Sequence, residues 1–150
     1  MERRQASRRV ARLASAVFAA AALHAASAQV VVREPAMVKT GLTELDQIVS
    51  QSALLISSGS YDQLQREPDR LEAGLAALRS GLGDQSTGSR ALLDLLTARA
   101  RVAASGMGEA ARTHNVSMLR ITESQLAQAV EAITALCPQE LRPARAPPAH

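Results

Sequence analysis

The feature that most constrains the fold is an apolar spacing that recurs in four consecutive segments. Leu, Ile, Val and Ala recur there at alternating intervals of three and four residues, the spacing of one buried helix face. The pattern predicts helices at residues 35–58, 60–82, 89–105 and 109–136. Because the breaks between them are short, we expect an all-α fold. Residues 35–137 would form an antiparallel up-down-up-down four-helix bundle.

Aromatic residues are almost absent from the segment that carries this pattern. The chain has no Trp, Tyr61 is its only Tyr, and Phe18 is its only Phe. An aliphatic core suits packing of helix on helix, whereas a β-sandwich favours β-branched and aromatic residues. With so few rings on which bases can stack, the composition argues against single-stranded nucleic acid as a partner.

Helix boundaries are predicted from Pro, Gly and Ser. Pro35 suits the first position of the first helix, and Gly59 suits its C-terminal end. Pro68 predicts either a kink or a true helix start within the second segment. Ser89 is the expected N-cap of the third helix, and Gly106-Met107-Gly108 is expected to separate it from the fourth.

Residues 1–28 have the organisation of a cleaved signal peptide. Five Arg precede an apolar run at residues 13–26, and Ala26-Ser27-Ala28 forms an A-x-A cleavage site. The run is shorter than the roughly 20 residues that span a bilayer. The sequence therefore predicts export to a bacterial periplasm, with no stable membrane span after cleavage.

Most of the chain's excess positive charge lies in this leader. It holds five of the 17 basic residues and one of the 14 acidic residues, so the rest of the chain is close to neutral. The basic isoelectric point is thus no indication of nucleic-acid binding.

The two ends of the mature chain are expected to lie outside the bundle. Residues 29–34 read as an extended arm, with no neighbouring strand to pair with. Residues 138–150 form a Pro-rich tail without a buriable face, which predicts disorder.

The sequence shows no arrangement of catalytic residues, so we expect no enzymatic activity. His114 and His150 are the only histidines after the leader, and one Cys is too few for a structural zinc site. We expect no cofactor. The alternative is a haem- or metal-binding bundle in which His114 pairs with Met37, Met107 or Met118.

Three further residues leave alternatives open. Cys137 is either buried at the end of the last helix or bridges a homodimer. Arg99 and Glu123 interrupt apolar stripes. They either reach water at the stripe margin or form a paired polar layer, and Arg99 is a candidate group for an anionic ligand.

The first predicted helix carries a family resemblance. Gln47-Ile48-Val49-Ser50-Gln51, an apolar run and Gly59 resemble the N-terminal sensor domain of type IV pili methyl-accepting chemotaxis transducers, which is related to nitrate/nitrite sensor domains. Residues 61–79 and 114–119 are similar to later helices of that family, so the resemblance covers about residues 40–136. Where the family has Gly, Arg and Arg, this chain has Glu44, Leu45 and Gln47, respectively.

The resemblance implies an exported sensor-like bundle that binds a small ligand or an envelope protein. Gln47, Ser50 and Gln51 are its candidate hydrogen-bonding groups, and Arg99 is the candidate cation. A structural or chaperone-like envelope protein that forms a homodimer is the remaining alternative.

Overall fold

The structure is a computed structural model that describes residues 29–144. Its helices are α2 (Pro35–Ser58), α3 (Tyr61–Leu64), α4 (Glu67–Gly81), α5 (Thr87–Arg112) and α6 (Val116–Leu136), followed by the short 3-10 helix η1 (Gln139–Leu141). The only β pairing within residues 29–144 is a single isolated bridge. The prediction of an all-α fold is therefore confirmed. The predicted signal peptide and residues 145–150 lie outside the described part.

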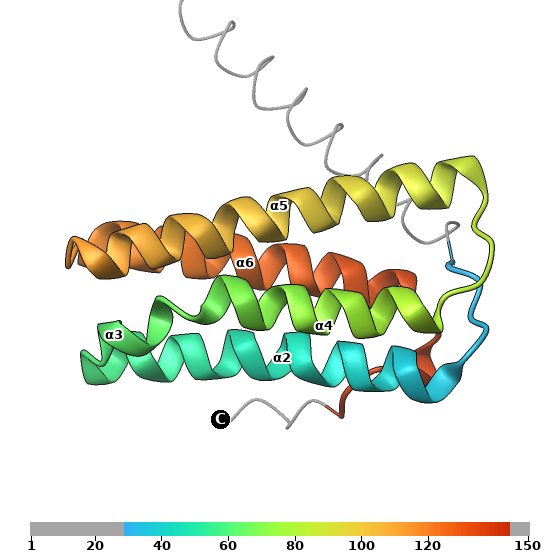
Figure 1. The fold of residues 1–150 in the computed structure, drawn as a ribbon, viewed down its shortest axis with the longest axis horizontal. Helices are drawn as coiled ribbons and strands as arrows, with labels where there is room; N and C mark the ends of the chain where they lie inside the picture. The colour runs from blue at the N-terminus through green and yellow to red at the C-terminus, as the bar shows by residue number, and fades with distance from the viewer. Residues whose placement is uncertain (1–28, 145–150) are drawn as a thin grey trace, which may run out of the picture.

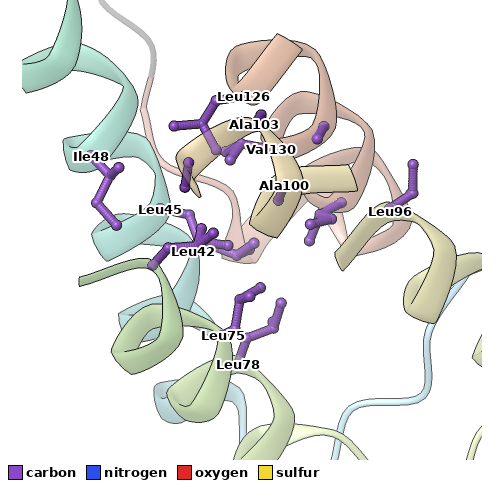
Figure 2. Packing of buried hydrophobic residues seen from close by; sticks show 14 of the residues in the cluster. Leu42, Leu45, Ile48, Leu75, Leu78, Leu96, Ala100, Ala103, Leu126 and Val130 are labelled. Atoms are coloured by element: carbon purple, nitrogen blue, oxygen red, sulfur yellow. The ribbon is translucent and has the colours of Figure 1, made fainter. Parts of the chain in front are cut away.

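Four long helices lie side by side, and α3 joins two of them at one end (Figure 1). α2 packs extensively on α4, and α5 packs extensively on α6. Smaller contacts between α2 and α6, and between α4 and α5, join the two pairs. Figure 2 shows side chains of all four long helices meeting in one aliphatic cluster. Its fully buried large members include Leu42, Leu45, Ile48, Leu71, Leu75, Leu78, Leu119, Leu126 and Ile133.

α2 and α4 approach each other backbone to backbone at two glycines. A Cβ atom on Gly41 would lie 2.5 Å from the backbone nitrogen of Leu78, and one on Gly81 would lie 2.7 Å from that of Val38. Both distances are too short for a side chain to be accommodated without moving a helix. The absence of a Cβ at these positions sets the separation of the two helices.

The end of α2 is where Gly59 predicted it. Gly59 adopts φ 73°, its N–H donates to Ile56 O (3.3 Å), and the N–H of Ser60 donates to Leu55 O (3.0 Å). These two bonds form a Schellman motif, in which a residue in the left-handed region closes the helix.

The predicted break at Gly106-Met107-Gly108 is wrong. α5 continues through it to Arg112, and His114 closes that helix with φ 52°. The N–H of His114 donates to Ala111 O (3.2 Å) and that of Asn115 to Ala110 O (2.9 Å), which is a second Schellman motif.

Packing explains why the two glycines stay helical. Each costs about 1 kcal/mol relative to Ala in a helix, but Met107 between them is fully buried in the core. A Cβ on Gly106 would lie 3.1 Å from Thr122 Cγ2, so α6 passes close to the helix there. Ending α5 at residue 105 would expose this buried surface to water.

The starts of α5 and α4 can be compared with the predicted helix boundaries. Ser86, not Ser89, is the N-cap of α5, because its hydroxyl oxygen accepts the N–H of Ser89 (3.2 Å) while Ser89 itself is buried. Pro68 lies in the first turn of α4, so the alternative of a true helix start is the one observed.

The N-terminal arm has partners, contrary to expectation. Val32 forms the isolated antiparallel bridge with Leu82, and the carbonyl of Val31 accepts the N–H of Gly83 (2.9 Å). The side-chain amide of Gln85 bonds both the N–H (2.8 Å) and the carbonyl (2.7 Å) of Val31. The partner is the α4–α5 loop rather than a strand, so no strand pattern in the sequence indicates it.

The start of the C-terminal tail is ordered where disorder was expected. Residues 139–141 form η1, and the Arg142 guanidinium donates to Cys137 O and Ala135 O, both at 3.0 Å. These bonds satisfy carbonyls at the end of α6.

None of the helices in residues 29–144 combines the length and the hydropathy of a membrane-spanning segment.

Candidate functional site

An open pocket of about 410 Å³ lies where the end of α2 meets the junction of α3 and α4. Its lining combines polar, charged and apolar side chains from all three helices: Gln51, Leu54, Leu55, Gln63, Arg66, Glu67 and Arg70. The volume lies within the range of pockets that take small organic molecules.

The local sequence explains why these side chains meet. Gly59 ends α2 and turns the chain back, and the single turn α3 brings residues 63–66 beside the end of α2. Pro68 then fixes the start of α4 so that Glu67 and Arg70 lie one turn apart, facing α2.

A buried carboxylate lies in the wall of this pocket. The side chain of Glu67 is 1% exposed, and its Oε1 lies 3.0 Å from Nη1 of Arg70. Its second oxygen, Oε2, is buried and accepts no hydrogen bond from residues 29–144. Burial raises the pKa of Glu67 above its ordinary value, although the neighbouring Arg70 opposes that shift.

Arg70 is held from two sides. Its Nη1 also donates to Oε1 of Gln51 on α2 (2.6 Å), so one nitrogen joins α2 to the buried carboxylate. The Arg70 side chain is 33% exposed. A guanidinium has five N–H donors, and within the described chain the other donors of Arg70 have no partner.

Arg66 supplies a second cation to the same pocket. Its side chain is exposed and makes no hydrogen bond or ion pair with any residue in 29–144. The side-chain amide of Gln63, which also lines the pocket, is likewise without a protein partner in that range. The pocket therefore presents hydrogen-bond donors that no residue within 29–144 uses.

The predicted site residues separate into different environments. Gln51 lines the pocket and contacts Arg70. Ser50 is exposed and donates its hydroxyl to Asp46 O (2.9 Å) within α2, and Gln47 is exposed outside the pocket. Arg99 is exposed on α5 and lies in a different groove.

That second groove runs between α5 and α6 and has a volume of about 490 Å³. Arg99 lines it together with Leu95, Val102 and Gln128. Val102 is 72% exposed, and five of the seven exposed large apolar residues in the described chain lie on α5 or α6: Leu95, Val102, Val116, Met118 and Ile121.

The remaining residues for which the sequence left alternatives are Glu123, Arg99 and Cys137. Glu123 is half-buried, and neither it nor Arg99 forms an ion pair within residues 29–144. Cys137 is buried, as one alternative held, and burial raises its pKa to about 11. A thiol in that state stays protonated near neutral pH and is a poor nucleophile.

His114 occupies a structural position. It is exposed, and its ring meets that of Tyr61 edge-on with centroids 5.6 Å apart. Met107 is fully buried, whereas Met118 is exposed. Within residues 29–144 no group of three or more His, Cys, Asp or Glu side chains is placed to hold a metal ion.

Sequence reasoning missed Arg66, Glu67 and Arg70. An acid in the first turn of a helix is ordinarily exposed, so the position of Glu67 alone does not indicate burial. A usable signal was present in the run Arg66–Arg70, which places a Glu and an Arg three residues apart at a Pro-marked helix start.

Comparison of the chain with family models, with curated proteins and with solved structures found no match. The resemblance to the chemotaxis transducer sensor domain therefore remains a prediction based on the motif residues of α2.

Proposed function

We propose that this chain is an exported periplasmic four-helix bundle that binds a small ligand in the pocket between α2, α3 and α4. In this proposal it acts as a sensor-like binding module and not as an enzyme. The ligand contacts Gln51, Arg66 and Arg70, of which only Gln51 was indicated by the sequence.

The contacts among the helices support the bundle. Each of α2, α4, α5 and α6 packs on two of the others, which is the contact pattern of four helices around one core. The connections at residues 82–86 and 113–115 are short, and short connections favour antiparallel neighbours. Export rests on the leader sequence alone, in which an Arg-rich start precedes an apolar run and an A-x-A site.

One observation carries the binding function: Arg70 is oriented by a buried carboxylate while most of its donors remain unused. Burying Glu67 costs free energy unless the charge is paired. An aliphatic residue at position 67 would avoid that cost. The presence of a carboxylate there therefore favours the interpretation that Glu67 holds Arg70 at the pocket. Binding sites characteristically use such fixed charged groups in a partly apolar pocket.

Mapping of small-molecule binding by NMR tests the proposal. The purified chain is titrated with a library of small polar and amphipathic compounds, and amide shifts are recorded. We expect the bound compounds to shift signals of Gln51, Gln63 and Arg70, and to lose affinity in Arg66→Gln.

Arg90→Gln is the matched control, because Arg90 is exposed near the start of α5 and its side chain has no ion pair within residues 29–144. Compounds that bind only in the α5–α6 groove, or a library in which nothing shifts the pocket signals, would contradict the proposal.

A further inference from the structure

The pocket between α2, α3 and α4 is lined by residues of two chemical kinds. The α3–α4 junction contributes the cationic Arg66 and Arg70. The end of α2 contributes Leu54, which is 69% exposed, and the half-buried Leu55. A ligand that covers Leu54 removes apolar surface from water, and one that bonds Arg66 gains a charge-assisted hydrogen bond.

We propose that the ligand is a small organic carboxylate with an apolar body. Its carboxylate accepts hydrogen bonds from Arg66 and Arg70, and its apolar body covers Leu54 and Leu55. This inference rests on the proposed function, since it names the chemical class of the ligand for the same pocket.

The charge of the lining favours a single negative charge. The lining includes two cations, Arg66 and Arg70, and one anion, Glu67, whose Oε1 is already bonded to Arg70. The neighbouring acids Asp62 and Asp69 do not line the pocket. A monocarboxylate balances the remaining positive charge, whereas a doubly charged phosphate would leave negative charge beside the buried Glu67.

The donors suit a carboxylate in geometry as well as in charge. The planar fork of a guanidinium matches the two oxygens of a carboxylate, and charge-assisted bonds of this kind are the strong ones. Arg70 is held by Gln51 and Glu67 through Nη1 alone, so its other nitrogens are available to a ligand. An uncharged apolar ligand would bury these donors without satisfying them.

Isothermal titration calorimetry with a matched probe series tests the inference. The probes are acetate, butyrate, hexanoate and hexanamide, which separate the contribution of the charge from that of the chain. We expect affinity to rise roughly two- to fourfold per added methylene. We expect hexanamide, which has the same chain without the charge, to bind about 10- to 100-fold more weakly than hexanoate.

Arg66→Gln is the main variant, because the Arg66 side chain has no partner within the described chain and its replacement should leave the fold unchanged. It should weaken hexanoate binding about tenfold or more. Arg70→Gln alone leaves Glu67 buried and unpaired, so the double variant Glu67→Gln/Arg70→Gln is measured beside it. Arg90→Gln should bind hexanoate as the unchanged chain does.

The outcomes separate the ligand class from the binding site. If hexanamide binds as tightly as hexanoate and shifts the Gln51 and Arg70 signals, the carboxylate class is overturned while the pocket stands. If Arg66→Gln and the double variant both bind hexanoate as tightly as the unchanged chain does, both the class and the site are overturned. If no probe binds, the carboxylate class is wrong, and the library mapping decides the pocket separately.

Discussion

Nη1 of Arg70 lies 3.0 Å from Oε1 of Glu67, a carboxylate that is 1% exposed at the first position of α4. The same nitrogen donates to Gln51 on α2 at 2.6 Å. A buried acid is thus connected to the pocket surface through one guanidinium. We therefore expect this pair to affect both the pH dependence of the chain's stability and the binding of a ligand in the pocket.

The pH dependence of stability is the first prediction. Burial raises the pKa of Glu67 above its ordinary 4.5, so the folded chain binds this proton more tightly than the unfolded chain does. Between 4.5 and the raised pKa the folded state holds more protons. The stability contributed by protonated Glu67 is therefore full below 4.5 and is lost as pH rises through that window.

Urea unfolding of the chain and of Glu67→Gln, followed by circular dichroism across pH, measures this. The difference in unfolding free energy between the two proteins should shift in favour of Glu67→Gln as pH rises through the window. A difference that is constant across pH would show that the pKa of Glu67 is not raised by burial.

The separation of α2 and α4 gives a second prediction. Gly41→Ala places a Cβ 2.5 Å from the backbone of Leu78, so the helices must move apart. We expect a loss of about 1–3 kcal/mol of unfolding free energy, the usual cost of overpacking. Gly88→Ala is the matched control, since Gly88 lies in α5 and a Cβ there meets nothing within 4 Å.

The control should gain up to about 1 kcal/mol, because Ala is the better helix former. Thermal unfolding of the two variants side by side checks both signs at once. Equal effects at the two positions would mean that α2 and α4 are not in close backbone contact at Gly41.

The turn after α5 gives a third prediction. His114 is the one described non-glycine residue with positive φ, at 52°. That conformation costs an L-residue roughly 1–2 kcal/mol, and Gly adopts it freely. His114→Gly and His114→Ala both lose the ring contact with Tyr61, so their comparison isolates the backbone effect.

His114→Gly should therefore be more stable than His114→Ala by about 1 kcal/mol. Chemical denaturation of both variants checks this. If His114→Ala proved the more stable, as Ala is in a continuous helix, α5 would not end at this turn.

The two helix ends also show what the sequence could predict. Gly59 and His114 both adopt the left-handed conformation, and each ends its helix in a Schellman motif. Only the glycine indicates that conformation in a sequence, because glycine is the residue that usually adopts it. The apolar spacing located all four long helices because it depends on local periodicity alone. The end of α5, in contrast, was predicted too early from Gly106 and Gly108, because the burial of Met107, a tertiary effect, outweighs the two glycines beside it.

The pocket was less predictable for a related reason. Gln51 was selected from its helix, but its partner Arg70 lies 19 residues away on α4. Which residues of α4 lie level with Gln51 depends on the Gly59 turn and on α3, and periodicity does not determine either. The burial of Glu67 has the same origin, since an acid in a helix's first turn is ordinarily exposed.

The most direct test of the account observes the arginine side chains themselves. Nε–Hε cross-peaks of the 15N-labelled chain are recorded by NMR while hexanoate is added, and single Arg→Gln variants assign them. The account predicts that the signals of Arg66 and Arg70 move together and saturate, while those of Arg90 and Arg99 stay in place. Movement of the Arg99 signal with Arg66 and Arg70 unchanged would contradict it, because the ligand would then bind between α5 and α6.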